Sequence, residues 1–475
     1  MKRTAILNVV GLSPRLIGPH TPRLSAYRDR GSHAIIRPAF PAVTCTAQSD
    51  YLTGTAPAAH GIVGNGWYDR TLAEVQFWKQ SNHLVHGEKL WETLRRHHPG
   101  ATCAKLFWWY NMYSSADFSI TPRPMYPADG RKVFDVYAWP YELRTGVKQA
   151  LGDFPFPGFW GPVAGVDSPQ GRADAASRWI AASARWVEER HRPTLSLVYL
   201  PHLDYNLQRH GPRASSTPGA ALNPRIERDL HEIDTLVGEL LDFYAARDVQ
   251  VLILSEYGIT QAEMPIHLNR HLREAGWLVV KEELGLELLD AGASQAFAVA
   301  DHQVAHVYVR DPAHVPRVRQ LLESTPGVAE VLDVEAQRAR GLAHARSGDL
   351  VVVAHENAWF TYYYWLEDAK APDFARCVDI HRKPGYDPVE LFTDPRLSTL
   401  ALRTGIAWRL LKKKLGFRML MDLIPLDATL VRGSHGAQPS DRADWPVLLG
   451  PSGSSLPAET TSTGVRDILL ERLCG

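Results

Sequence analysis

Short apolar runs alternate with amphipathic stretches along much of this chain, and that alternation limits its possible folds more than any other feature. The apolar runs are rich in β-branched residues and are continuous, as in strands buried on both faces of a parallel sheet. The stretches between them repeat apolar residues at helical spacing. The predicted strands are residues 5–10, 34–38, 195–200 and 249–254, and the predicted helices are residues 21–31, 45–53 and 224–246. We therefore expect an α/β protein whose central, parallel-rich sheet carries helices on both faces.

Two regions interrupt this order. Residues 114–172 are rich in Pro, Gly and aromatic residues and lose any periodicity, so we predict a loop insertion there. Residues 285–382 hold two strand candidates around a helical stretch, which indicates a small inserted α+β cap. The cap strands are 304–309 and 350–354, and its helix is 313–323. The core is then expected to span residues 1–284 and to be completed by residues 383–475, which end in a predicted helix at 461–473.

Charge and composition exclude several classes of function. Lys and Arg together number 52, as do Asp and Glu, so no net field would hold a polyanion, and we expect no nucleic-acid partner. The chain has no apolar run of about 18 residues, which predicts no transmembrane segment. Its first apolar stretch is too short for a signal sequence, and its four cysteines form no Cys-x-x-Cys pair. We expect a cytoplasmic protein with free thiols, and its oligomeric state is open.

The most informative local motif is Phe-Pro-Ala-Val-Thr-Cys-Thr at residues 40–46. Its Thr44 lies where a helix is predicted to begin, and unpaired backbone N–H groups at such a position favour a phosphate. An alcohol is a poor nucleophile near neutral pH, but a divalent cation can lower its pKa. Thr44 is therefore either a nucleophile that attacks phosphorus or a helix N-cap.

Further motifs bear on this choice. They are Thr-Pro-Arg-Leu at 21–24, His-Gly-Ile-Val-Gly-Asn at 60–65, Leu-Trp-Glu at 90–92 and Ala-Lys-Leu-Phe-Trp at 104–108. Together with residues 40–46 they resemble the nucleotide pyrophosphatase/phosphodiesterase family of the alkaline phosphatase superfamily. The resemblance implies that Thr44 forms a phosphorylated enzyme intermediate and that Asn65 donates a hydrogen bond to a phosphate oxygen. Asn65 also suits a plain turn in Gly-Asn-Gly.

The same resemblance implies a divalent metal centre. The first metal-binding loop of the family reads Asp-x-x-x-His, which places Asp204 at the carboxylate and Gln208 at the histidine. A neutral amide oxygen is a weaker zinc ligand than an imidazole. His202 and His210 are nearby substitutes, although each also suits a plain hydrogen-bonding role.

The other metal-binding motifs are altered as well. Residues 255–258 read Ser-Glu-Tyr-Gly where the family has Ser-Asp-His-Gly, so Glu256 can still ligate but Tyr257 is a poor ligand. Val10 replaces the Asp that precedes Gly-Leu, whereas His435 matches the last histidine of the family. The expected cofactor is a divalent metal, and the types of ligand indicate zinc. We expect one or at most two ions per chain. The expected ligands are Asp204, Glu256 and His435, with Gln208, His202 and His381 as further candidates.

Two polar segments offer replacement groups. Residues 373–387 form a loop that holds acidic and histidine side chains, and a plain solvated loop is the alternative. Its candidate ligands are Asp379, His381 and Asp387. A second cluster in the cap region is assigned to the cap's own polar network. It consists of Asp301, His302 and His306.

Aromatic and basic side chains at residues 105–111 are candidates for a substrate pocket. Flat rings accept a base, a sugar or an apolar leaving group, and they equally suit packing of the cap. The candidates are Lys105, Trp108, Trp109 and Asn111.

These residues predict a metal-dependent hydrolase with a Thr nucleophile, which acts on a phosphodiester or pyrophosphate bond of a small nucleotide-type phosphate ester. The alternative is a catalytically degenerate protein that binds phosphate esters as a carrier, scaffold or regulator, and the altered ligands favour it. A sulfatase or phosphomutase relative is a weaker reading, because a sulfatase needs Cys or Ser in place of Thr44.

Overall fold

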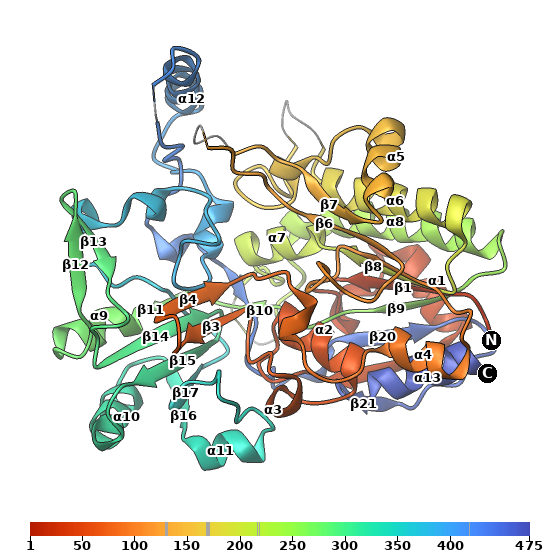
Figure 1. Ribbon diagram of the computed structural model, residues 1–475, viewed down its shortest axis with the longest axis horizontal. Helices are drawn as coiled ribbons and strands as arrows, with labels where there is room; N and C mark the ends of the chain where they lie inside the picture. Colours follow the sequence, from red (N-terminus) through yellow and green to blue (C-terminus); the bar gives the residue numbers. More distant parts are fainter. Residues whose placement is uncertain (129–131, 168–171, 216, 218, 418) are drawn as a thin grey trace.

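Two lobes, each with its own sheet and hydrophobic core, make up the chain (Figure 1). The computed structural model describes residues 1–128, 132–167, 172–215, 217, 219–417 and 419–475. The larger lobe is built on a nine-stranded sheet and the smaller one on a four-stranded sheet. The two termini lie side by side on the larger lobe, where the backbone N–H of Lys2 donates to the carbonyl of Leu473 at 3.0 Å (Figure 1).

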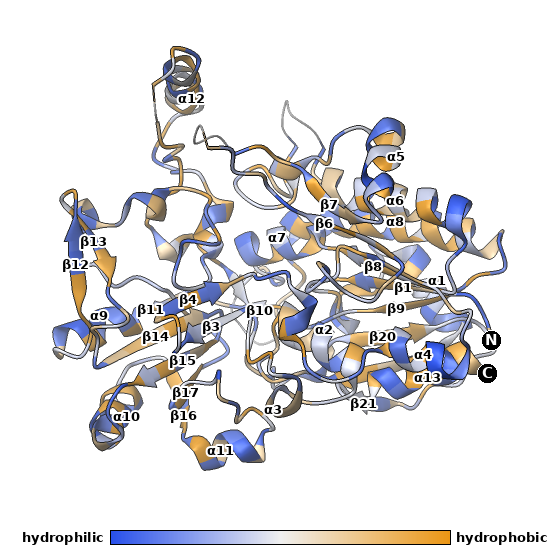
Figure 2. Cartoon of the chain, in the orientation of Figure 1, coloured by the Kyte–Doolittle hydropathy of each residue, from blue (hydrophilic) through white to orange (hydrophobic). Residues whose placement is uncertain are grey.

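The nine strands lie in the order β21-β2-β20-β9-β1-β8-β5-β6-β7, and the central run from β9 to β6 is parallel throughout. All residues of β1 and β8 are buried, and Figure 2 shows the central strands as mainly hydrophobic. The predicted parallel-rich sheet is therefore confirmed. The strands are β1 (Thr4–Val9), β2 (Ser32–Arg37), β5 (Cys103–Leu106), β6 (Phe118–Pro122), β7 (Val136–Trp139), β8 (Leu195–Leu200), β9 (Gln250–Leu254), β20 (Val447–Gly450) and β21 (Glu459–Thr461).

Helices cover both faces of this sheet, as predicted. On one face α1, α6 and α8 pack against one another and against the sheet, and on the other α2, α4 and α13 group together (Figure 1). Helix α2 ends at Gly54, whose φ of 69° is the left-handed conformation that glycine adopts without strain. The helices of this lobe are α1 (Pro22–Arg30), α2 (Thr44–Thr53), α3 (Pro57–His60), α4 (Leu90–His97), α5 (Tyr141–Leu151), α6 (Ala175–His191), α7 (His202–His210), α8 (Glu227–Ala245) and α13 (Val465–Cys474).

The smaller lobe has a sheet of order β14-β15-β17-β16, and the hairpin of β3 and β4 packs against it. The buried residues of its hydrophobic core lie between Ala262 and Val431 in the sequence, and Phe77 of the hairpin joins them. The strands are β3 (Gly66–Asp69), β4 (Glu74–Phe77), β10 (Thr260–Gln261), β11 (Met264–Ile266), β12 (Val280–Glu283), β13 (Leu286–Leu289), β14 (Ala296–Asp301), β15 (Val304–Val309), β16 (Val328–Leu332), β17 (Leu350–Ala354), β18 (Ala358–Phe360) and β19 (Gly433–Ser434). The helices are α9 (Leu268–Glu274), α10 (Val315–Glu323) and α11 (Val334–Ala339).

Two segments differ from the sequence prediction. The region 114–172, expected as loops, contains β6, β7 and α5. These elements are short and lie at the edge of the sheet, so the Pro- and Gly-rich flanks hide their periodicity. Helix α12 (Thr399–Lys414) was also not expected, and it projects from the rest of the chain (Figure 1). None of the helices in the described residues is long and apolar enough to cross a membrane.

Candidate functional site

Thr44 is the first residue of α2, and its side chain lies on the wall of a large cavity between the lobes. The N-cap position belongs to Val43, so the Thr44 hydroxyl is not used as a cap. It instead makes a 3.2 Å hydrogen bond with the phenol of Tyr257. The hydroxyl is thus presented to the cavity at the amino end of a helix, where a phosphate would be favoured.

The Tyr257 phenol continues into a chain of hydrogen bonds. It donates to Asp204 Oδ1 at 3.3 Å, while Gln208 Nε2 donates to Asp204 Oδ2 at 2.7 Å. Tyr386 donates from its phenol to Gln208 Oε1 at 2.8 Å. Both oxygens of Asp204 are therefore occupied by neutral donors, and burial raises the pKa of this carboxyl to about 7.

Glu256 lies next to this chain and is fully buried. Its Oε1 accepts hydrogen bonds from Asn8 Nδ2 at 2.6 Å and Gln48 Nε2 at 2.5 Å. Burial raises the pKa of Glu256 to about 8, against the opposing effect of these hydrogen bonds. Glu256 and Asp204 follow the carboxyl ends of β9 and β8, the edge at which open α/β sheets bind ligands.

Asn65 is held both by the smaller lobe and by the first turn of α2. Its backbone N–H and its side-chain Nδ2 donate to the two oxygens of Asp301 at 2.7 Å and 3.0 Å. Its Oδ1 accepts from the backbone N–H of Cys45, at the start of α2, at 3.0 Å. His302 Nδ1 also contacts Asp301 Oδ1 at 2.8 Å. The Asp301 cluster therefore reaches beyond its own lobe and fixes the turn that carries Asn65.

His435 packs against the nucleophile motif. Its Nδ1 donates to the backbone carbonyl of Ala42 at 2.7 Å, and its ring lies parallel to Tyr257 with centroids 3.5 Å apart. The ring of His302 lies on it with centroids 3.8 Å apart. Burial lowers the pKa of His435 well below its ordinary value, which leaves a neutral ring.

These side chains do not fit the metal centre that the sequence resemblance implies. Val10 offers no ligand atom, Tyr257 is a phenol whose pKa burial raises well above its ordinary value, and each oxygen of Asp204 already accepts a hydrogen bond from a neutral donor. Within the described part of the chain, no three His, Cys, Asp or Glu side chains are arranged to hold a metal ion. Among the described residues of this cluster, Glu256 Oε2, His435 Nε2 and Asn8 Oδ1 are buried acceptors without a hydrogen bond, and the amide oxygen of Asn8 is a weak zinc ligand. A zinc site normally needs about three protein ligands.

The cavity next to Thr44 has a volume of about 1910 Å³ and is lined mainly by apolar and aromatic side chains. Trp109 lies on its wall and packs against Trp78, with centroids 4.6 Å apart. His381 also lines the cavity, where its Nδ1 lies 3.3 Å from the carbonyl of Phe77. Such a volume exceeds what a mononucleotide needs, since typical ligand pockets span about 300–1,000 Å³.

Four other candidates from the sequence, Lys105, Trp108, Asn111 and His202, do not line this cavity. Lys105 is buried and donates to the carbonyls of Trp109 at 2.7 Å and Tyr110 at 2.8 Å, so it supports the turn beneath the cavity wall. Burial lowers the pKa of Lys105 to about 7. Trp108 is in the core, and Asn111 donates to the backbone carbonyls of Lys105 and Ile120. His202 is buried with neither ring nitrogen hydrogen-bonded within the described structure.

Sequence reasoning did not foresee the parts played by three residues. Tyr257 was interpreted only as a lost ligand, whereas the structure places it between Thr44 and Asp204. Tyr386 lies in the loop 373–387, whose sequence indicates ligands but gives no sign that its phenol reaches Gln208. Asp301 was assigned to its own lobe. No local pattern signals a contact between residues so far apart in the chain.

The sheet, its helices and the polar cluster at the carboxyl ends of its strands define a protein with the fold of the alkaline phosphatase superfamily. The chain belongs to the Type I phosphodiesterase / nucleotide pyrophosphatase family, which matches residues 4–387. It is 23% identical over 251 residues to an uncharacterized pyrophosphatase/phosphodiesterase of Schizosaccharomyces pombe. The match covers 50% of this chain but only 41% of the S. pombe protein.

Two solved structures share the fold over nearly their whole lengths. Murine ectonucleotide pyrophosphatase/phosphodiesterase 5, solved in an inactive form with AMP, has a TM-score of 0.56 and 14% identity, and the match covers 100% of this chain and 95% of the murine one. Phosphonoacetate hydrolase from Sinorhizobium meliloti, solved with phosphonoformate, has a TM-score of 0.59 and 14% identity, covering 99% and 96%. At 14% identity, both similarities show a shared fold alone.

Proposed function

We propose that the chain is a phosphodiesterase or pyrophosphatase-type hydrolase in which Thr44 is the nucleophile. The observation that carries this proposal is the hydrogen-bonded series from Thr44 through Tyr257 to Asp204, at the wall of the cavity. An alcohol becomes a competent nucleophile when a positioned base takes its proton. Asp204, with its pKa near neutral pH, is suited to that task.

The proposed chemical step uses these three side chains. Thr44 Oγ1 bonds to phosphorus as its proton moves to Tyr257 Oη, and the phenolic proton of Tyr257 moves to the Asp204 carboxylate. The bond from phosphorus to the leaving oxygen breaks, and that oxygen keeps the electron pair and takes a proton from water. The hydroxide left by that water takes a proton from a second water as the second water attacks phosphorus, the bond to Thr44 breaks, and Asp204 returns its proton through Tyr257 to Thr44 Oγ1.

The side chains present do not make a divalent-metal site, so no step is assigned to a metal ion here. The expected zinc, at one or at most two ions per chain, would have Glu256 and His435 as its free strong ligands, with only the weakly ligating amide oxygen of Asn8 beside them. Two ligands rarely hold a catalytic cation.

The substrate class follows from the family and the cavity. A nucleotide-type phosphate ester suits aromatic walls such as Trp109, and the murine relative was solved with AMP. We therefore expect a phosphodiester or pyrophosphate whose larger group occupies the cavity.

A covalent trapping experiment tests this function. The purified chain is mixed with an aryl phosphodiester or a dinucleotide pyrophosphate and quenched in acid, and the peptide containing Thr44 is analysed by mass spectrometry. A phosphoryl-type adduct on Thr44, absent in Thr44→Ala, is the expected result. Turnover that persists in Thr44→Ala would show that another group attacks.

A second candidate function is binding without hydrolysis. It is favoured by one observation, namely that neutral partners already satisfy Asp204 and occupy Glu256 Oε1. In that case calorimetry would detect a phosphate ester binding to the cavity, while neither turnover nor an adduct on Thr44 would be found.

A further inference from the structure

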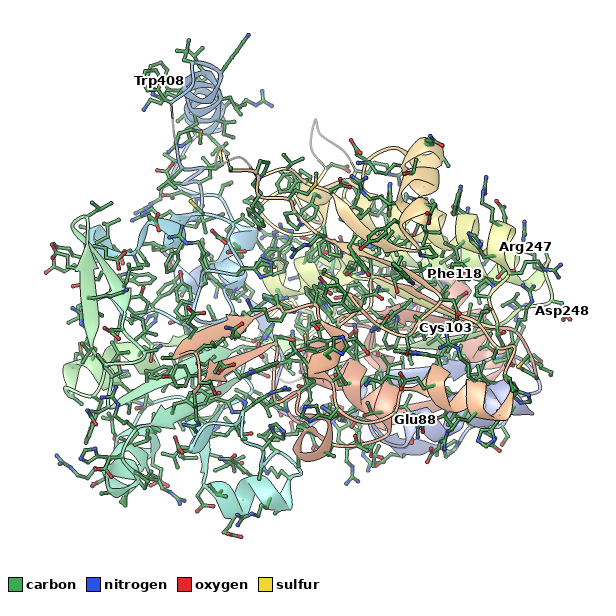
Figure 3. The ribbon with its side chains drawn as sticks, in the orientation of Figure 1. Glu88, Cys103, Phe118, Arg247, Asp248 and Trp408 are labelled. Atoms are coloured by element: carbon green, nitrogen blue, oxygen red, sulfur yellow. The ribbon has the colours of Figure 1, made fainter. Side chains whose placement is uncertain are left out.

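Helix α12 stands apart from both lobes and exposes large apolar side chains (Figure 1). Figure 3 places Trp408 on this projecting helix, far from the sheet of the larger lobe. Trp408 is 57% exposed, and Leu400 is 72% exposed. Exposed apolar residues that gather on one element mark a contact surface more often than those scattered singly.

These residues form a stripe on one face of the helix. Leu400, Trp408 and Leu411 are spaced by eight and three positions and are all exposed, and Leu415, which follows just after the end of the helix, is exposed as well. Helical geometry brings residues at such spacings to one side. The opposite side carries Arg409, which pairs with Asp422 at 2.6 Å and ties the helix to the chain that follows it. The apolar stripe therefore faces away from the anchored side.

The charge of this segment has a single sign. Residues 399–421 contain six basic residues and no acidic residue. Arg403 and Lys412 are exposed beside the stripe, and Lys412 Nζ lies 5.3 Å from the ring centroid of Trp408. A stripe of Trp and Leu flanked by Lys and Arg is the composition of helices that lie in the interface of anionic lipid bilayers.

The segment after α12 connects this surface to the cavity. Phe417, Leu420 and Met421 are exposed, and all three also line the cavity that contains Thr44. Across the cavity, Tyr126 and Phe134 are likewise both exposed and cavity-lining. A bilayer contacted by α12 would therefore lie at the apolar mouth of the cavity.

We propose that α12 together with residues 415–417 and 419–421 forms an interfacial surface that binds anionic phospholipid bilayers. The apolar stripe enters the boundary between headgroups and acyl chains, and the basic side chains pair with lipid phosphates. Lipid binding by α12 does not require the proposed hydrolysis, because no residue of α12 lines the cavity or belongs to the Thr44 cluster.

Vesicle co-sedimentation of the purified full-length chain tests the proposal. Vesicles of phosphatidylcholine with about 30% phosphatidylglycerol are compared with pure phosphatidylcholine vesicles, at low salt and at about 0.5 M salt. We expect binding to the anionic vesicles and a marked loss of binding in pure phosphatidylcholine or at high salt. A wild-type chain that stays in the supernatant with anionic vesicles would overturn the proposal.

Paired variants separate the two contributions. One double variant, Trp408→Ser with Leu411→Ser, removes apolar area. The other, Arg403→Glu with Lys412→Glu, reverses charge. Each should lower the partition coefficient for anionic vesicles by at least about tenfold. Leu284→Ser is the matched control, because Leu284 is fully exposed on the turn between β12 and β13 and should bind as the wild type does. Far-ultraviolet circular dichroism verifies folding.

The alternative occupant of the surface is a second copy of the chain. Analytical ultracentrifugation would then show a dimer that the Trp408 pair of substitutions dissociates. A dimer of this kind, together with vesicle binding that neither pair of substitutions weakens, would replace the lipid surface as the partner of α12.

Discussion

Both carboxylate oxygens of Asp301 accept hydrogen bonds from Asn65. One accepts from its backbone N–H at 2.7 Å and the other from its side-chain Nδ2 at 3.0 Å. The two residues are 236 positions apart and come from different lobes. Because Asn65 also accepts from the N–H of Cys45, this contact links the smaller lobe to the first turn of α2. The position of Thr44 thus depends on packing between the lobes.

Replacing Asp301 by Ala should destabilise the protein measurably. Two buried donors of Asn65 would lose their acceptor, and each unsatisfied buried donor costs about 1–3 kcal/mol. Asp301→Asn keeps one acceptor oxygen and should cost less. Urea unfolding gives both free energies, and equal stability of Asp301→Ala and the wild type would contradict this account of the Asn65 turn.

The secondary structure was largely predictable, because continuous β-branched runs specify buried strands. The predicted runs 195–200, 304–309 and 350–354 coincide with β8, β15 and β17. The contact between Asp301 and Asn65 could not be predicted, because two residues this far apart in the sequence leave no periodic signal. Helix α12 was missed for a related reason, namely that its apolar residues face outward and not toward a core.

Within the site, the sequence indicated which residues gather but not how they bond. Thr44, Asp204, Glu256 and His435 lie in one cluster. The substitutions in the metal motifs were visible as losses. That Tyr257 would occupy the space between Thr44 and Asp204 depends on side-chain placement, which no spacing rule supplies.

Tyr257→Phe should lower turnover by roughly 100-fold to 10,000-fold, the range of a lost proton-transfer group. The substitution removes only the phenolic oxygen and keeps the ring that stacks on His435. Tyr205→Phe is the matched control, because Tyr205 also lines the cavity but has no hydrogen bond to Thr44 or Asp204 within the described structure. Steady-state rates with a phosphodiester decide between them. If both variants lost the same activity, the effect would come from cavity shape and not from the relay.

The rate should rise as the pH passes through about 7. Burial raises the pKa of Asp204 to about 7, and only its carboxylate form can accept the phenolic proton. In Asp204→Asn this limb of the pH–rate profile should disappear together with most of the activity. A profile in the wild type that is flat between about pH 5 and pH 9 would exclude Asp204 as the base.

Stability should show the opposite trend with pH. The pKa of Glu256 is raised from 4.5 in a model peptide to about 8 by burial, so between these values the folded chain holds a proton that the unfolded chain has lost. The free energy of unfolding therefore falls as pH rises across that window. Glu256→Gln should flatten this fall, whereas the exposed Glu335→Gln should not. Denaturation midpoints measured at several pH values between 4.5 and about 8 test this prediction. If stability fell with pH equally in the wild type and in Glu256→Gln, the fall would not come from Glu256.

Metal content is the last prediction, and it follows from the ligand set. Val10 has no donor atom, the Tyr257 phenol is engaged by Thr44 and Asp204, and Gln208 presents its Nε2 to Asp204. Among the described residues of this cluster, Glu256, His435 and the amide oxygen of Asn8 then have a free acceptor, and because an amide is a weak zinc ligand the set falls short of the about three ligands that hold a catalytic zinc tightly.

We therefore expect at most one divalent ion per chain in elemental analysis, and turnover that survives dialysis against a chelator. Glu256→Gln and His435→Ala should each abolish any such ion, since these two residues supply its strong ligands. The exposed His355→Ala serves as the control. Two ions per chain that resist the chelator, with activity lost on their removal, would mean that the cluster rearranges around metal and that the Tyr257 relay is not the path of the proton.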